Sequence, residues 1–117
     1  MLSKNKRYIL LCVFVVVGRA ANADVARGKA LFVERCATCH GSEGAGDGPV
    51  AASLPPELKP RNLKEFKVKY ATDDVKFKEL LMKGGAAVGL NAMMPPQTGL
   101  GDADLDSIVQ YVHTLKK

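Results

Sequence analysis

Two segments of the chain, one near each end, have apolar residues at helical spacing. From Asp24 to about Arg35, helical spacing is seen at Ala26, Ala30, Leu31 and Val33, and Asp24 is a residue type that caps helices. From about Asp102 onward the apolar positions repeat every three or four residues, and acidic residues occupy the first turn. The buried stripe of this second helix is expected at Leu105, Ile108, Val109, Val112 and Leu115.

The middle of the chain predicts shorter helices between two long loops. A short helix is expected from Leu63 to Tyr70, and a longer one from Asp73 to about Lys83, with Thr72 as its cap. Glycine and proline dominate residues 41–62 and 84–101, which predicts loops. No segment shows the alternating pattern of a strand. The sequence therefore predicts an all-α fold with long loops.

The first 23 residues read as a secretory signal peptide rather than as part of this fold. A positively charged start is followed by the apolar run Ile9–Val17, and small residues at Ala21 and Ala23 suit cleavage after Ala23. A spanning helix needs about 20 apolar residues, which this run does not reach. We expect a signal peptide at 1–23 and one domain at 24–117. An uncleaved N-terminal anchor is the alternative.

The signal peptide accounts for most of the positive charge of the chain. The full sequence has 17 basic and 12 acidic residues, and four of the basic ones precede position 24. The domain that remains is nearly neutral, so the positive net charge of the full sequence does not indicate nucleic-acid binding. A local excess persists between Lys59 and Lys83, where eight basic residues accompany four acidic ones. That region is either a solvated surface or a docking surface for a partner.

Cys36, Cys39 and His40 form the most informative motif of the chain. Cys12 lies inside the signal peptide, so Cys36 and Cys39 are the two thiols of the exported domain. A Cys-x-x-Cys-His sequence is the signature of covalent haem attachment. The alternatives are weaker: a thioredoxin-like pair follows a strand, a zinc site needs a fourth ligand, and a disulfide across so short a loop has poor geometry.

A second iron ligand is expected opposite His40, because haem electron carriers commonly pair His with Met. Met94 is the favoured candidate, since it lies in a loop and Pro95 holds it in an extended conformation. Met93 remains an alternative. Met82 falls near the end of a helix, where core packing is expected, and His113 falls on the last helix, where a surface or half-buried imidazole is expected.

The second ring nitrogen of His40 also needs a partner. A ligating imidazole usually donates its other N–H to a carbonyl or carboxylate, which fixes the ring orientation. The carbonyl of Pro49, at the end of the glycine-rich loop, is the expected acceptor.

With these motifs, residues 24–117 resemble a class I c-type cytochrome of the short bacterial type. The resemblance implies three to five helices wrapped around one haem c, held by two thioether bonds. It implies that Gly28 packs against Tyr111 where the first and last helices cross, and it assigns the acceptor role to Pro49 and the sulfur ligand to Met94. Gly101 departs from the family pattern, since many members have Ser or Thr there.

These features predict a one-electron carrier rather than an enzyme. We expect a periplasmic, monomeric protein without a transmembrane segment in its mature chain, exchanging electrons with redox proteins that dock near the haem edge. Two alternatives remain. The chain could be the haem subunit of a larger oxidoreductase complex. It could instead be a gas-binding or peroxidatic haem protein in which the Met ligand is labile.

Overall fold

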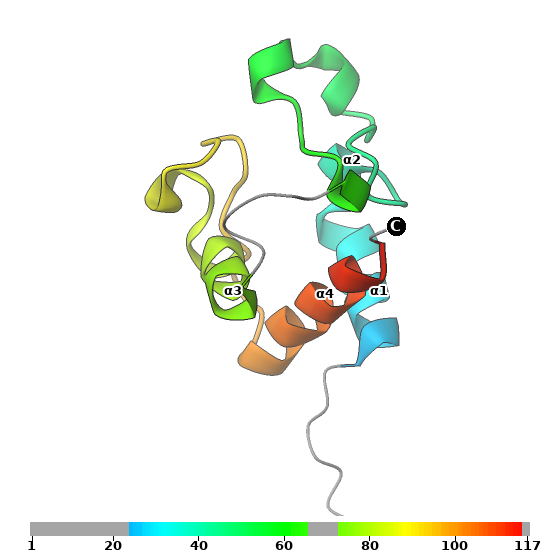
Figure 1. Ribbon diagram of the computed structural model, residues 1–117, viewed down its shortest axis with the longest axis vertical. Coiled ribbons are helices and arrows are strands. Elements are labelled where there is room, and N and C mark those ends of the chain that lie inside the picture. The colour runs from blue at the N-terminus through cyan, green and yellow to red at the C-terminus, as the bar shows by residue number, and fades with distance from the viewer. Residues whose placement is uncertain (1–23, 66–72, 116–117) are drawn as a thin grey trace, which may run out of the picture.

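The computed structural model describes residues 24–65 and 73–115, and within these ranges every regular element is helical (Figure 1). The prediction of an all-α fold is confirmed. The three longer helices are α1 (Val25–Arg35), α3 (Asp74–Lys83) and α4 (Asp102–Leu115). The shorter elements are α2 (Ala37–His40) and the single-turn helices η1 (Ala51–Ser53), η2 (Pro56–Leu58), η3 (Leu63–Glu65) and η4 (Ala86–Val88).

Helices α1 and α4 cross in direct backbone contact at Gly28 (Figure 1). A Cβ atom at this position would overlap the carbonyl oxygen of Ser107 and lie 2.9 Å from the Cβ of Tyr111. Beside the crossing, the rings of Phe32 and Tyr111 pack with centroids 5.3 Å apart and planes inclined by 60°. The contact between Gly28 and Tyr111 that the resemblance implied is confirmed.

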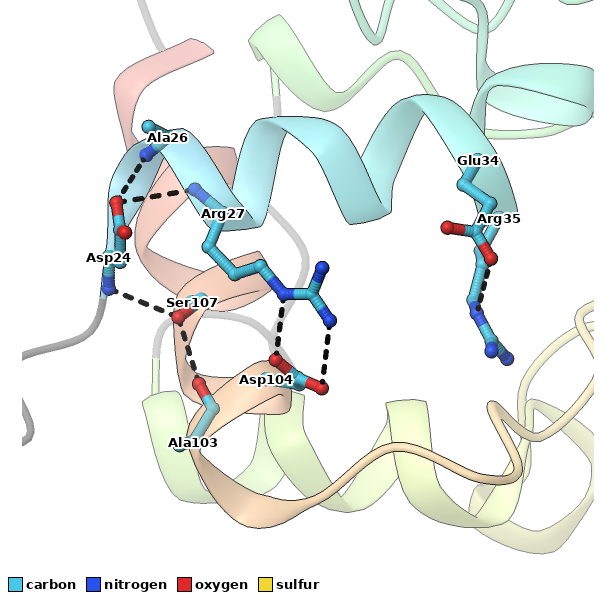
Figure 2. A network of polar contacts seen from close by, with 8 residues as sticks. All are labelled: Asp24, Ala26, Arg27, Glu34, Arg35, Ala103, Asp104 and Ser107. Atoms are coloured by element: carbon cyan, nitrogen blue, oxygen red, sulfur yellow. Dashed lines mark hydrogen bonds and ion pairs between the residues drawn. The ribbon is translucent and has the colours of Figure 1, made fainter.

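Polar contacts also join the start of α1 to α4 (Figure 2). Asp24 caps α1 as predicted, because its Oδ1 accepts from two backbone N–H groups of the first turn. The backbone N–H of Asp24 donates to Ser107 Oγ at 3.1 Å, and this hydroxyl donates to the carbonyl of Ala103. Arg27 and Asp104 form an ion pair, with 3.1 Å between Nε and Oδ1. The two helices are therefore joined by both packing and hydrogen bonds.

The face that α1 buries differs from the expected one. Its buried residues are Gly28, Leu31 and Phe32, whereas Val33 is 49% exposed. The residues at Ala26 and Ala30 are also exposed. The physical reason is the crossing at Gly28: once that position faces α4, the residues three and four later share its face, and the neighbouring positions turn to solvent.

The predicted stripe of α4 is confirmed for four of its five positions, and Tyr111 joins it. Leu105, Ile108, Val109 and Val112 are buried. Leu115 is partly buried and packs against the same core. This face meets Leu31 and Phe32 from α1 and the apolar face of α3, so the three longer helices share one hydrophobic core.

Helix α3 begins one residue later than predicted, and its cap is Asp73. The carboxylate of Asp73 accepts from the N–H groups of Val75 and Lys76, at 2.9 and 3.4 Å. The prediction that Thr72 caps this helix is therefore wrong, because the extended backbone that a capping residue adopts occurs at Asp73. Thr72 itself lies outside the described residues. The helix ends at Gly84 as expected.

Met82 does not pack in the core, contrary to expectation. Helix α3 buries Phe77, Leu80 and Leu81, while Met82 is 52% exposed. Position 82 is one residue beyond that face, which rotates its side chain away from α4.

Helix α3 is also joined to α4 by ion pairs of Lys78. Its Nζ lies 2.8 Å from Asp102 Oδ1 and 2.9 Å from Asp106 Oδ1.

The region around position 65 is only partly described. Of the short helix expected from Leu63 to Tyr70, the described part is the single turn η3, and residues 66–70 lie outside the described ranges. The signal-peptide prediction for 1–23 also falls outside them. Within residues 24–65 and 73–115, no helix is long and apolar enough to cross a membrane.

Candidate functional site

A cavity of about 710 Å³ separates the α1–α2 junction from the loop between α3 and α4. Cys36, Cys39 and His40 line this cavity, and so do Met93 and Met94 from the loop between α3 and α4. The floor is apolar, and it is formed by the core side chains Phe32, Leu80, Leu81, Ile108 and Val112. The structure therefore brings together residues that the sequence predicted to act on one group, although they lie far apart along the chain.

Helix α2 places the two thiols and the imidazole on the cavity wall. The N–H of Cys36 donates to the Phe32 carbonyl at the end of α1, and the Cys36 carbonyl accepts from the N–H of His40, both at 2.8 Å. This single turn presents Cys36, Cys39 and His40 along one wall. Both thiols are half-buried, and they are not joined by a disulfide.

The chemistry of Cys36 argues against a redox pair or a zinc site. Burial raises the pKa of its thiol to about 11, because the charged thiolate loses hydration; the nearby Arg35 opposes this only in part. Redox-active cysteines have a lowered pKa, so this raised pKa argues against the redox pair. Among the described residues, no three His, Cys, Asp or Glu side chains form a metal-binding group.

His40 is held in one tautomer by a backbone carbonyl. Its Nδ1 lies 3.1 Å from the carbonyl oxygen of Arg61, which can only accept, so Nδ1 carries the proton and Nε2 keeps its lone pair. Burial lowers the pKa of His40, and the bond to Arg61 opposes that shift. A neutral imidazole with an available Nε2 is the form that binds iron.

The expected acceptor for His40 is wrong: the partner of Nδ1 is Arg61 and not Pro49. Pro49 is exposed, and the loop around it is bonded to the carbonyls of α2. There Gly48 donates to the carbonyl of Cys39 at 3.0 Å and Val50 donates to that of Thr38. The later segment at 60–62 supplies the carbonyl that meets the imidazole.

Met94 and Met93 differ in their surroundings. Met94 is half-buried and packs against the hydrophobic core, whereas Met93 is 50% exposed. The N–H of Met94 donates to the Asn91 carbonyl, at 3.2 Å, and the Met94 carbonyl accepts from the N–H of Gly85, at 2.9 Å.

His113 is half-buried and its Nε2 pairs with Asp74 Oδ1, 2.6 Å away, as expected for a surface or half-buried histidine on a helix.

The residues of the cavity fit a haem group covalently bound to the two thiols. A volume of about 710 Å³ lies in the range of sites that enclose a cofactor. The wall offers two unpaired thiols spaced three residues apart, a neutral imidazole directly after the second thiol, and thioether sulfurs opposite. These donors and the apolar floor suit a large, mostly apolar ring with a central iron.

A helical fold with this site defines a class I c-type cytochrome, and comparison with known families agrees. Residues 25–116 match the model of the family described as Cytochrome c. The chain belongs to the cytochrome c family, and its cofactor is covalently bound haem c.

Relatives of this chain include a protein of similar size and segments of larger proteins. It is 34% identical over 96 residues to cytochrome c-554(547) of Halothiobacillus neapolitanus, which covers 80% of this chain and 98% of that relative. It is 31% identical to the cbb3-type cytochrome c oxidase subunit FixP of Bradyrhizobium diazoefficiens and 36% identical to the subunit CcoP of an Azospirillum species. The matches cover 79% and 84% of this chain but only 28% and 31% of those subunits.

A solved structure also resembles this fold. A chain of the reducing HAO-like protein complex Kustc0457/Kustc0458 of Kuenenia stuttgartiensis superposes with a TM-score of 0.62 at 28% identity. The alignment covers 77% of this chain and 41% of that one. The domain therefore occurs in a protein of its own size and within larger redox proteins.

Proposed function

We propose that this protein is an exported one-electron carrier whose haem c is ligated by His40 and Met94. The observation that supports the proposal is the shared cavity, which is lined by His40 and by Met94 from the loop between α3 and α4. With both axial positions filled, no site remains for a substrate, so the protein transfers electrons without acting as an enzyme.

Each residue has a distinct part in this proposal. The bound haem would supply one-electron chemistry at its iron. Cys36 and Cys39 would hold it through thioether bonds, and His40 would ligate the iron through Nε2 while Arg61 orients the ring. Met94 would supply a thioether as the second iron ligand, and such a ligand raises the reduction potential. The apolar floor keeps water from the iron.

The proposed location is the periplasm, after removal of residues 1–23. The sequence of that segment supports export, and the first described helix begins directly after the proposed cleavage site, since Asp24 caps α1. N-terminal sequencing of the purified protein tests this proposal. A mature chain that begins at Asp24 is expected, and a chain that keeps its first residues would show a retained anchor instead.

Redox proteins are the proposed partners, and they would dock as transient encounters with a monomer at the open side of the cavity. Of the basic residues that the structure describes between Lys59 and Lys83, two form ion pairs within the fold: Lys78 with acids of α4, and Lys83 with Glu79 at 2.7 Å. Lys59 and Arg61 line the cavity and are better placed to meet an acidic partner.

Reversing the charge of Lys59 is expected to slow electron transfer to an acidic redox partner. Lys59→Glu replaces attraction by repulsion at the rim, so the second-order rate constant at low salt should fall roughly three- to tenfold. Stopped-flow measurements over a range of ionic strength test this. Lys29→Glu, on the exposed surface of α1, is the matched control and should change the rate little. Equal rate constants for Lys59→Glu and Lys29→Glu would show that Lys59 is not part of the docking surface.

A second candidate function is that of a haem subunit in a larger complex. The likeness to FixP, CcoP and a chain of the HAO-like complex favours it, because in each case the matched domain is only part of a larger redox protein. Purification from the native membrane and soluble fractions under mild conditions distinguishes the two. A carrier is expected as a free monomer, whereas a subunit elutes with its complex.

Optical spectra of the exported protein test the carrier against the gas-binding or peroxidatic alternative. A pyridine haemochrome spectrum should show haem bound through two thioethers. The oxidised protein should show a sulfur-to-iron charge-transfer band, and the reduced protein should remain low-spin and bind carbon monoxide poorly. A high-spin reduced form that binds carbon monoxide readily would reject the closed coordination sphere.

A further inference from the structure

Asn91 lies at the turn that carries both methionines of the cavity wall. Its backbone carbonyl accepts from the N–H of Met94 at 3.2 Å, and its side-chain Oδ1 accepts from the N–H of Met93 at 2.9 Å. One residue therefore bonds two consecutive amides of the loop. These two bonds fix the backbone from which the Met94 side chain leaves.

The opposite side of this turn is held by the two glycines that end α3. The N–H of Gly85 donates to the Met94 carbonyl at 2.9 Å, and a Cβ at Gly85 would overlap the carbonyl oxygen of Asn91. At Gly84 a Cβ would lie 2.9 Å from Pro96. The backbone of Met94 is thus bonded at both its N–H and its carbonyl, and it is packed closely against the end of α3.

The side-chain amide of Asn91 also reaches the other wall of the cavity. Its Nδ2 donates to the carbonyl of Leu58 in η2 at 3.1 Å, across 33 residues of sequence. Leu58 and Asn91 both line the cavity. Between segments 51–62 and 84–101, both of which the structure describes in full, no other hydrogen bond is present. Asn91 therefore joins the loop at 84–101, which carries both methionines, to the segment at 51–62 that follows the haem-attachment motif.

We propose that Asn91 is a positioning residue that keeps the sulfur of Met94 on the haem iron by anchoring its loop to Leu58. The inference rests on the proposed His40–Met94 ligation. A loop held at both its backbone and its far side loses little freedom when the sulfur binds, so detachment of Met94 is disfavoured. Removing the anchor favours the detached state and opens the iron to external ligands.

Imidazole binding to the oxidised holoprotein measures this effect, because imidazole competes with Met94 for the iron. In Asn91→Ala the dissociation constant for imidazole is expected to fall roughly fivefold, the factor that one ordinary hydrogen bond supplies. The sulfur-to-iron band should weaken and the midpoint potential should fall. Asn91→Asp keeps an acceptor for Met93 but has no donor for Leu58, so its values should lie between those of Asn91→Ala and the wild type.

Gln110→Ala is the matched control. Gln110 also uses a side-chain amide to join two segments, since its Nε2 donates to Asp74 at 3.2 Å, and it does not line the cavity. Gln110→Ala should lose about as much stability as Asn91→Ala. Its sulfur-to-iron band, midpoint potential and imidazole affinity should stay at wild-type values. An equal gain in imidazole affinity in Gln110→Ala would show general loosening and would overturn the positioning role.

Met94→Ala separates this inference from the ligation on which it rests. If the wild type shows the sulfur band and Met94→Ala loses it, the ligation stands; wild-type behaviour of Asn91→Ala would then overturn the role of Asn91 alone. If the wild type has no sulfur band, both the ligation and the positioning role are overturned. Tighter imidazole binding and a weaker band confined to the Asn91 variants support the proposal.

Discussion

Replacing Met94 by alanine is expected to abolish the sulfur-to-iron band of the oxidised protein and to open the iron to carbon monoxide when reduced. The reason is that Met94 packs against the core and lines the same cavity as His40, and among the described residues no other core-packed thioether lines that cavity. The midpoint potential should fall by on the order of 0.1 V, well within the roughly 0.8 V that axial ligands span. Optical spectra and a redox titration measure these changes.

Met93→Ala is the matched control, because it removes a neighbouring thioether from the same cavity. Met93 is half exposed, and its side chain is not part of the core. The variant should keep the sulfur band, and its potential should stay close to that of the wild type. Loss of the band in Met93→Ala with retention in Met94→Ala would reverse the assignment of the ligand.

Replacing Gly28 by alanine is expected to cause the largest loss of stability. The added methyl group would overlap the carbonyl of Ser107, and a backbone atom cannot rotate away, so α1 and α4 must separate. Overpacking of this kind costs about 3 kcal/mol, which exceeds the gain of about 1 kcal/mol from the better helix former. The melting temperature of the holoprotein should fall by roughly 10 °C, as measured by circular dichroism.

Gly101→Ser adds a larger side chain where the structure has room, and it serves as the control. No heavy atom beyond its chain neighbours lies within 4 Å of a Cβ built at Gly101. The residue precedes the first turn of α4, where a serine hydroxyl can cap the helix. Its stability should be unchanged or higher by a few tenths of a kcal/mol. A Gly28→Ala variant as stable as Gly101→Ser would show that the crossing can relax.

Local features of the sequence predicted much of this protein because their causes are local. Cys36, Cys39 and His40 lie within five consecutive residues, so their spacing predicted a haem-attachment site without knowledge of the fold. The apolar stripe of α4 and the stop at Gly84 were predicted for the same reason. Helix caps were less certain: the carboxylate of Asp73 bonds the first turn of α3, one position after the expected Thr72.

Features that depend on how distant segments meet were predicted less well. The buried face of α1 followed from the crossing at Gly28 and not from its own apolar spacing, so Val33 is exposed. The acceptor for His40 is the carbonyl of Arg61, whereas the loop around Pro49 is bonded to the carbonyls of Thr38 and Cys39 in α2. The bond from Asn91 to Leu58 had no sequence signal, since both residues read as ordinary loop positions.

The sequence by itself determined the class of this protein and its cofactor, and it predicted the attachment residues, because covalent haem chemistry requires particular side chains at fixed short spacing. It also predicted the helices, whose apolar periodicity is a local property. Only the tertiary structure decided which carbonyl orients His40, which methionine packs against the core, and which residue ties the two cavity walls together. Those outcomes depend on where each loop passes once α1, α3 and α4 have packed, and no local pattern encodes that path.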